Sequence, residues 1–246
     1  MTEEKISENK IYYDKRFGNL SQQLNEEEQI RWNAISKTLK GLELDKNIRI
    51  ADFGCGRGWL AHKLSLFGKV TGFDLSEKAI ENARQSFPEI NFFCLNAAGK
   101  IPDEFKEQFD LVVSSEVIEH INHQEQYLSN VFQLLKKNGH FLISTPNGKW
   151  MDIFYSNGRE KWKQPVENWL SIESLKKLLH KSSLYATQTT TFNSEWIFQF
   201  KPKITVAWIA KPMLRKTLKF FGIYTWTLNL LNRKQFGLNI ITLAIK

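Results

Sequence analysis

The chain contains 246 residues, of which 42% are hydrophobic and 24% are charged. These proportions are ordinary for a globular protein and exclude a disordered chain, a collagen and a coiled coil. A chain of this length predicts a single domain, residues 1–246, whose core folds without a disulfide framework or a structural metal. The N-terminal residues are polar and acidic and no apolar run follows them, so we expect no secretory signal and a cytoplasmic location.

The net charge of +8 is concentrated at the C-terminal end of the chain. Residues 196–246 contain nine Lys or Arg and no Asp or Glu, whereas residues 1–195 sum to −1. The same C-terminal segment holds nine of the 32 aromatic residues. Any anionic partner is therefore expected to meet this end of the protein.

Helical and strand patterns alternate along the chain from residue 48 onwards. Before them, residues 1–44 are charged and helix-prone, and the apolar positions between 30 and 39 have the spacing of an amphipathic helix. The expected strands are residues 48–53, 69–73, 90–95, 109–114, 140–144, 184–192 and 238–245, and the expected helices are 58–67, 76–86, 124–137 and 172–180. Ser76 can cap the second of these helices, and Asn138-Gly139 is a typical end for the third. This alternation indicates a parallel sheet covered by helices on both faces.

A glycine-rich turn follows the first expected strand. Residues 52–58 read DFGCGRG. Glycine is needed where the backbone turns tightly and comes within contact distance of a ligand that a Cβ atom would block. Asp74 lies 20 residues after Gly54, at the tip of the next expected strand. A carboxylate there can accept hydrogen bonds from both ribose hydroxyls of an adenosine-bearing cofactor.

The spacing and the charge of this turn distinguish between cofactors. A dinucleotide-binding turn has the pattern G-x-G-x-x-G, and here the third glycine comes one residue early. An acidic residue, Asp52, lies two positions before the first glycine, and its negative charge repels a pyrophosphate but suits a cationic ligand. S-adenosylmethionine carries a sulfonium and an amino group, so the residues favour this cofactor.

Several segments, in order, resemble the class I S-adenosylmethionine-dependent methyltransferases. They are ADFGCGRG, VTGFD, NFFCLNAAGKIP, FDLVVSSEVIEHI and LLKKNGHFLISTPN, within about residues 48–192. The resemblance implies an α/β fold with a Rossmann-like, doubly wound, mostly parallel seven-stranded sheet in the order 3-2-1-4-5-7-6, its last strand antiparallel. Around it we expect a helical cap in residues 1–44, a cofactor-binding core in 45–194, a basic aromatic insertion in 195–236 and a final strand in 237–246.

The same resemblance assigns residues to the cofactor. The glycines line it, Asp74 holds its ribose, Asn96 and Ala97 flank the adenine, and Ser115 lies beside the cofactor. Many relatives have Asp in place of Asn96, whose amide oxygen can still accept a hydrogen bond from the adenine amino group. The full set of expected cofactor-binding residues is Asp52, Gly54, Cys55, Gly56, Gly58, Asp74, Leu75, Asn96, Ala97 and Ser115.

A second group of polar residues, Glu116, Glu119 and His120, follows the strand expected at 109–114. If the chain turns helical there, the three side chains fall on one helix face and meet beside the cofactor. The segment SSEVIEH resembles the ubiquinone-biosynthesis O-methyltransferases, and this resemblance implies that all three residues hold Mg²⁺, which would lower the pKa of an acceptor hydroxyl. Two alternatives stay open: His120 as a metal-free general base, or a purely structural group.

Small-RNA 2′-O-methyltransferases also carry two acids and a histidine here, completed by a histidine from a later H-x-x-H segment. The comparable residues 160–170, EKWKQPVENWL, contain no histidine, which counts against RNA as the acceptor. Asn147, after the strand expected at 140–144, is a further candidate for contact with the acceptor, although loop residues there are mostly connectors. In the cap, the candidates for contact with the cofactor's carboxylate or adenine are Tyr12, Tyr13 and Arg31, although a plain surface or packing role is preferred for each.

The basic aromatic insertion predicts an amphipathic helix over residues 212–222, with Pro212 in its first turn and Gly222 at its end. The uncharged run 220–232 is shorter than the roughly 20 residues that span a bilayer. Three interpretations compete: the insertion roofs the acceptor pocket, lies on an anionic membrane surface, or binds RNA. A one-sided apolar stripe favours the first two together.

The residues and the resemblance together predict an S-adenosylmethionine-dependent methyltransferase, with Glu119 and His120 as its catalytic residues. Its expected substrate is an oxygen of a small or lipid-linked acceptor, either a quinone-precursor phenol or a sugar or lipid intermediate of the cell envelope. The alternatives are an RNA 2′-O-methyltransferase and a non-catalytic, cofactor-binding module that docks on the inner face of a membrane.

Overall fold

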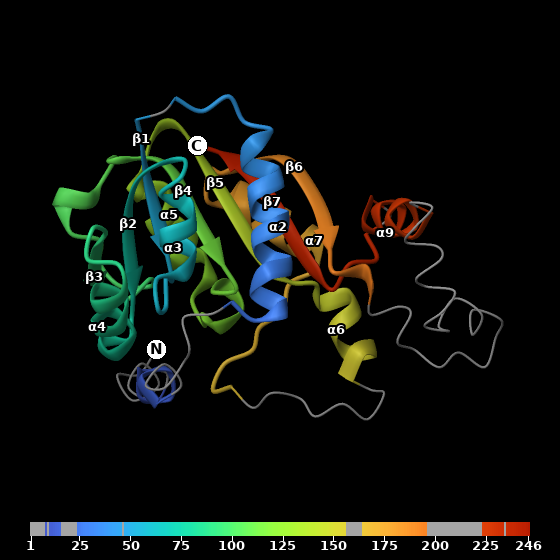
Figure 1. The fold of residues 1–246 in the computed structure, drawn as a ribbon, viewed down its shortest axis with the longest axis horizontal. Coiled ribbons are helices and arrows are strands. Elements are labelled where there is room, and N and C mark those ends of the chain that lie inside the picture. Colours follow the sequence, from blue (N-terminus) through green and yellow to red (C-terminus); the bar gives the residue numbers. More distant parts are fainter. Residues whose placement is uncertain are drawn as a thin grey trace.

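The computed structural model describes residues 8, 10–15, 24–45, 47–155, 164–195, 223–233 and 235–246. At its centre is a seven-stranded sheet in the order β3-β2-β1-β4-β5-β7-β6 (Figure 1). The strands are β1 (Ile48–Phe53), β2 (Gly68–Asp74), β3 (Asn91–Cys94), β4 (Phe109–Ser115), β5 (Leu135–Pro146), β6 (Tyr185–Phe192) and β7 (Asn239–Ile245). Strands β1 to β5 pair in parallel, whereas β7 runs antiparallel to both β5 and β6. The predicted fold class and strand order are confirmed.

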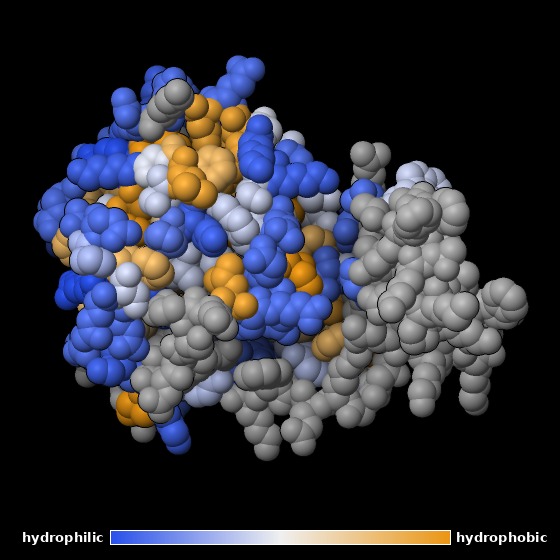
Figure 2. Space-filling view, in the orientation of Figure 1, coloured by the Kyte–Doolittle hydropathy of each residue, from blue (hydrophilic) through white to orange (hydrophobic). Residues whose placement is uncertain are grey.

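Helices cover both faces of the sheet. The helices that pack on one buried cluster are α2 (Glu26–Lys40), α3 (Trp59–Leu64) and α4 (Glu77–Ser86), and those on the other are α5 (Gln124–Leu134) and α7 (Ile172–Lys181). Because both faces are covered, the central strands β1 and β4 are buried along most of their length. The outer surface seen in Figure 2 is mostly hydrophilic, with apolar residues in separate groups.

Helices α2 and α4 each begin at a residue whose side chain caps the first turn. Ser76 caps α4 as predicted, because its hydroxyl accepts a hydrogen bond of 3.0 Å from the backbone N–H of Ala79. Asn25 and Glu28 form a reciprocal capping box at the start of α2. These caps place the first turn of each helix at the edge of the sheet where the site lies.

The prediction of a helix over residues 124–137 is wrong at its C-terminal end. Helix α5 ends at Leu134, and Leu135 already pairs with Phe109 as the first residue of β5. Asn138, with a φ of 62°, and Gly139 lie within β5, where the pairing with β4 is irregular. The Asn-Gly pair thus accommodates an irregularity in the strand rather than ending a helix, because burial of Leu135 against β4 outweighs local helix propensity.

Two further described helices lie outside the predicted elements: α6 (Gly148–Tyr155) and α9 (Ile223–Arg233). Helix α6 packs its apolar side chains against Leu238 and Trp169. The helix predicted over 212–222 lies outside the described residues. No helix in the described part of the chain is long and apolar enough to cross a bilayer.

Candidate cofactor and acceptor site

The glycine-rich turn leaves β1 in a conformation that only glycine adopts easily. Gly54, Gly56 and Gly58 have φ values of 93°, 50° and 84°. A Cβ atom on Gly54 would lie 2.2 Å from Cγ2 of Val117. The turn is held to β2 because the N–H groups of residues 54 and 55 both donate to the carbonyl oxygen of Phe73, at 2.8 and 2.9 Å.

At two predicted residues of this turn, Gly58 and Cys55, the position of the side chain is enclosed by the protein itself. A Cβ atom on Gly58 would lie 2.9 Å from the ring of Phe92 and 3.0 Å from Ala83, so this glycine allows α3 to start close against its neighbours. Cys55 is buried among apolar residues, and burial raises the pKa of its thiol well above the usual value. Only the backbone of Cys55 is therefore available to a ligand.

Asp74 ends β2 beside the glycine turn, as predicted. Its carboxylate accepts hydrogen bonds from the N–H groups of Gly56 at 2.8 Å and Ser76 at 2.9 Å. Burial raises the pKa of Asp74, and these backbone donors oppose the rise. The carbonyl oxygen of Leu75 accepts from the thiol of Cys94, which lies on the adjacent strand. A fixed acceptor therefore stands at the edge of the sheet, where the ribose was expected.

Asp52 is fully buried at the end of β1, and both of its carboxylate oxygens lack a hydrogen-bond partner among the described residues. Burial, reinforced by the negative charge of Asp74, raises the pKa of Asp52 to about 8. A buried polar group without a partner is costly, and a nearby cation would favour its charged form. Asp52 therefore fits a ligand that brings positive charge to the glycine turn.

The expected adenine-binding turn is held by a residue that sequence reasoning missed. Asn130 on α5 is 1% exposed and donates from Nδ2 to the carbonyl oxygens of Ala97 at 2.8 Å and Gly99 at 2.6 Å. Asn96 uses its side-chain oxygen within the turn, accepting from the N–H of Ala98. The signal in the sequence was a polar residue among the buried positions of the helix pattern.

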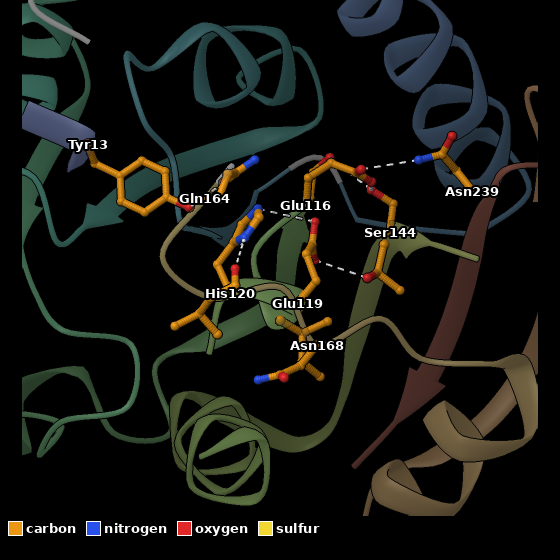
Figure 3. A network of polar contacts seen from close by, with 12 residues as sticks. Tyr13, Glu116, Glu119, His120, Ser144, Gln164, Asn168 and Asn239 are labelled. Carbon is orange, nitrogen blue, oxygen red and sulfur yellow. Dashed lines mark hydrogen bonds and ion pairs between the residues drawn. The ribbon is translucent and has the colours of Figure 1, made fainter. Parts of the chain in front are cut away.

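A second group of polar side chains forms a network that joins β4, β5 and β7 (Figure 3). The hydroxyl oxygens of Ser115 and Ser144 lie 2.8 Å apart. Ser144 donates to Oε1 of Glu116 at 3.3 Å, and Asn239 donates to Oε2 of Glu116 at 3.1 Å. Both carboxylate oxygens of Glu116 thus have partners within the protein.

Glu119 and His120 lie next to this network (Figure 3). The hydroxyl of Thr145 donates to Oε2 of Glu119 at 3.0 Å, and Oε1 of Glu119 lies 3.6 Å from Nε2 of His120. Nδ1 of His120 lies 3.0 Å from the carbonyl oxygen of Val166. Because a carbonyl oxygen only accepts, Nδ1 carries a proton and donates it to this bond, which fixes the orientation of the imidazole.

The local conformation differs from the predicted helix face. Glu116 has a left-handed φ of 58°, and the only helical turn is the 3-10 segment η2 (Ile118–His120). The helix prediction is wrong because the N–H of Glu116 continues the pairing of β4 with β5, donating to the carbonyl oxygen of Ser144. The two glutamates still come close: burial raises the pKa of each to about 7, and for Glu116 the charge of Glu119 adds to the rise.

The predicted Mg²⁺ set is not formed by this arrangement. Within the described ranges, no three His, Cys, Asp or Glu side chains gather so that they could hold a metal ion. The oxygens of Glu116 and Glu119 face serine, asparagine, threonine and histidine groups instead. We therefore derive no chemistry through a metal.

Residues 44–201 match the family described as "Methyltransferase domain". The chain belongs to this family. It is 34% identical over 107 residues to the ubiquinone biosynthesis O-methyltransferase of Pelagibacter ubique strain HTCC1062, and the aligned region covers 42% of this chain and 43% of that protein. It is 26% identical over 174 residues to the malonyl-[acyl-carrier protein] O-methyltransferase of Bacillus anthracis, covering 67% and 64%. The chain thus matches less than two thirds of the length of either relative.

Solved methyltransferase structures share the fold. The S-adenosylmethionine-dependent methyltransferase of Mesorhizobium loti superposes with a TM-score of 0.59 at 22% identity, covering 88% of this chain and 98% of that one. Phosphoethanolamine N-methyltransferase 2 of Haemonchus contortus, in complex with S-adenosyl-L-methionine, gives a TM-score of 0.57 at 19% identity, covering 87% and 52%. The chain therefore has the fold of these S-adenosylmethionine-dependent methyltransferases, and its glycine turn, Asp52 and Asp74 fit that cofactor.

Two residues of the N-terminal cap, Arg31 and Tyr13, lie beside the group of Glu116, Glu119 and His120. The Nε atom of Arg31, on α2, is buried without a hydrogen-bond partner among the described residues, and its charge lowers the pKa of both Glu116 and Glu119. Tyr13 donates to Oε1 of Gln164 at 3.0 Å, and its ring centroid lies 6.0 Å from that of His120. Arg31 and Tyr13 thus lie beside Glu116, Glu119 and His120, and their expected contact with the cofactor stays a prediction.

The cap is joined to the methyltransferase core at two further places. Lys10 forms an ion pair of 2.9 Å with Glu77 at the start of α4. Glu28 on α2 forms a buried ion pair of 2.6 Å with Arg57 inside the glycine turn. Sequence reasoning missed this second pair, although the N-x-x-E capping box that begins α2 identifies Glu28.

Asn147, a candidate for contact with the acceptor, is only 1% exposed. Its Nδ2 donates to the carbonyl oxygen of Gly237 at 3.0 Å, and its backbone N–H donates to that of Leu238 at 2.6 Å. Asn147 therefore joins the end of β5 to the start of β7, and its contacts are structural.

Proposed function

We propose that this methyltransferase transfers the methyl group of S-adenosylmethionine to an oxygen atom of a small or lipid-linked acceptor. The observation that carries the proposal is the orientation of His120: Val166 engages Nδ1, so Nε2 remains as the basic nitrogen beside Glu119. The names of the two O-methyltransferase relatives support oxygen as the acceptor atom.

The chemistry asks for alignment and for removal of one proton. When bound, S-adenosylmethionine supplies an electrophilic methyl group on a positively charged sulfur. Nε2 of His120 would accept the proton of the acceptor hydroxyl, so that the hydroxyl oxygen could take the methyl group from a bound cofactor. The carboxylate of Glu119, held by Thr145, stabilises the resulting imidazolium.

The surroundings of His120 suit this role. Its side chain is 16% exposed, so it can be reached by an acceptor, whereas that of Glu119 is 2% exposed. Tyr13 contacts the imidazole and hydrogen bonds to Gln164, so these two residues can help to orient the acceptor (Figure 3). Holding the hydroxyl and the methyl group in line contributes to the rate by proximity.

The acceptor class can be tested with labelled cofactor. The enzyme and radiolabelled S-adenosylmethionine are incubated in three separate reactions, which contain a lipid, a small-metabolite or an RNA extract of the enzyme's own cells. We expect label in the lipid or metabolite extract. Label in RNA alone would support the RNA 2′-O-methyltransferase alternative and overturn the proposal.

The base can be tested once a labelled extract is found. We expect His120→Ala to bind S-adenosylhomocysteine within about twofold of the unmodified enzyme but to transfer label about 10²-fold more slowly. His180→Ala is the control, because His180 is exposed on α7. Unchanged label transfer by His120→Ala would remove His120 from the mechanism, and a protein that binds cofactor but labels no extract would support the non-catalytic alternative.

A further inference from the structure

Three exposed apolar side chains lie on and just after helix α9. We name the side chains of Trp226, Leu230 and Phe236 the α9 patch. Their exposed fractions are 65%, 40% and 37%. Trp226 and Leu230 are four residues apart in the helix and therefore project from the same side of it. Large apolar side chains that are exposed together, rather than singly, mark a contact surface.

The segment that carries the α9 patch is anchored to the fold. Thr191 in β6 donates from its hydroxyl to the carbonyl oxygen of Asn232 at 2.7 Å. Trp150 on α6 donates from Nε1 to the carbonyl oxygen of Gln235 at 2.7 Å, and its ring stacks on that of Phe236 with centroids 5.1 Å apart. The patch is therefore presented on a positioned segment, while its two helical residues stay outside the described core clusters.

The charge of the surrounding sequence selects the class of partner. Residues 196–246 carry nine Lys or Arg and no acidic residue, and the sequence of α9 itself, IYTWTLNLLNR, contains no acid. An exposed tryptophan and leucine in a strongly cationic segment suit a partner that offers an apolar layer for these side chains and negative charge for the cations. The interface of an anionic bilayer has this chemistry. An RNA matches the charge but offers no apolar layer for Leu230.

The α9 patch also lies close to the site along the chain and in the sheet. Helix α9 is the last helix before β7, and β7 begins at Asn239, which pairs with Pro146 at the end of β5. The side chain of Asn239 donates to Glu116. Figure 1 shows α9 beside β6 at the edge of the sheet, and α6 below the end of β5. A surface that binds α9 therefore lies near the acceptor side of the site.

We propose that the α9 patch docks the protein on an anionic lipid surface, so that the site takes its acceptor from the membrane. The docking is independent of the proposed methyl transfer, whereas the membrane origin of the acceptor rests on it. A lipid surface raises the local concentration of a membrane-partitioned acceptor, and the C-terminal cations hold the enzyme there electrostatically.

Vesicle sedimentation of the full chain tests the docking. Vesicles of phosphatidylcholine alone are compared with vesicles that also contain phosphatidylglycerol, at about 0.1 M and about 0.5 M NaCl. We expect binding only to the vesicles with phosphatidylglycerol, and at least about tenfold weaker binding at the higher salt concentration. Equal binding to both vesicle types, or binding to neither, would overturn the proposal.

Two matched variants locate the contact. We expect the double variant Trp226→Ser, Leu230→Ser to bind phosphatidylglycerol vesicles about tenfold or more weakly, since two apolar side chains no longer enter the interface. Leu66→Ser is the control, because Leu66 is 78% exposed and lies between α3 and β2. Unchanged vesicle binding by the double variant would refute the assignment to α9. The assignment would also be refuted if an RNA oligonucleotide bound the protein more tightly than any vesicle did, and bound the double variant and the control variant equally well.

The two proposals fail in distinguishable ways. Sedimentation measures lipid binding without turnover, so its failure leaves the methyl transfer unaffected. If the double variant does not fold, as judged by circular dichroism, the comparison of headgroups and salt on the unmodified protein still decides whether docking occurs. Labelled product found only in the aqueous extract, together with confirmed docking, would refute the membrane origin of the acceptor alone.

Discussion

Gly54→Ala probes the turn on which cofactor binding depends. The new Cβ atom would lie 2.2 Å from Cγ2 of Val117, at a backbone φ of 93°. A left-handed conformation costs an L-residue about 1–2 kcal/mol, and overpacking costs about 1–3 kcal/mol more. We therefore expect the free energy of unfolding to fall by about 2–5 kcal/mol, and the affinity for S-adenosylhomocysteine to fall with the displaced turn.

A second substitution separates the two causes. In the double variant Gly54→Ala, Val117→Ala, the nearest remaining atom of residue 117 would be Cβ, at 3.3 Å. The steric part of the loss should be recovered while the backbone part remains, giving a favourable coupling of about 1–3 kcal/mol in a double-mutant cycle. Val117→Ala alone supplies the fourth corner of the cycle.

Urea unfolding and calorimetric titration with S-adenosylhomocysteine measure these changes. Gly41→Ala is the matched control, because Gly41 has an ordinary φ of −83° and its added Cβ would come no closer than 3.3 Å to its nearest neighbour, the carbonyl oxygen of Thr38. If Gly54→Ala unfolds and binds like Gly41→Ala, the close approach of Val117 to the turn does not exist in solution.

Three other predictions concern buried polar groups. Glu28→Gln should lower the free energy of unfolding by about 3–5 kcal/mol in urea titrations, since the buried guanidinium of Arg57 loses its ion pair with the Glu28 carboxylate; a loss below about 1 kcal/mol would contradict this. Asn130→Leu should weaken binding of S-adenosylhomocysteine and lower stability by about 2–4 kcal/mol, because the carbonyl oxygens of Ala97 and Gly99 lose their donor; unchanged calorimetric affinity would speak against a role in holding the turn. Burial raises the pKa of Asp52 from 3.8 to about 8, so between these pH values Asp52 is protonated in the folded protein and ionised in the unfolded chain. The free energy of unfolding should therefore fall as the pH rises through this range. Asp52→Asn should make that slope less steep in urea unfolding between about pH 5 and about pH 8.5, while Glu116 and Glu119 still contribute to it; an equally steep slope in the variant would assign it wholly to other groups.

Local sequence signals were sufficient for most of the fold. The alternation of apolar strands with helices predicted the covered, mostly parallel sheet, and the glycine turn and Asp74 predicted the edge at which the site lies; the resemblance supplied the strand order, and the structure has all three. Such features depend on side-chain size and backbone freedom within a few residues, which the sequence expresses directly. The resemblance in the five ordered segments supplied the remaining step from fold class to family.

The details of the acceptor side required the tertiary structure. Glu116, Glu119 and His120 were expected on one helix face, but pairing of β4 with β5 holds Glu116 in a left-handed conformation. Their hydrogen-bond partners come from β5, β7 and residue 166, far away in the chain. No local pattern could therefore show that these side chains face the protein's own donors instead of forming a metal set.

The amino-acid sequence by itself determined the sheet, the glycine turn and the cofactor, because each depends on short-range periodicity or on residues with special backbone freedom. Only the tertiary structure decided which groups compensate the buried charges: Arg57 for Glu28, Thr145 and His120 for Glu119, and no partner among the described residues for Asp52. The physical reason is that burial and long-range pairing set the cost of a charge, and both arise only when distant segments pack together.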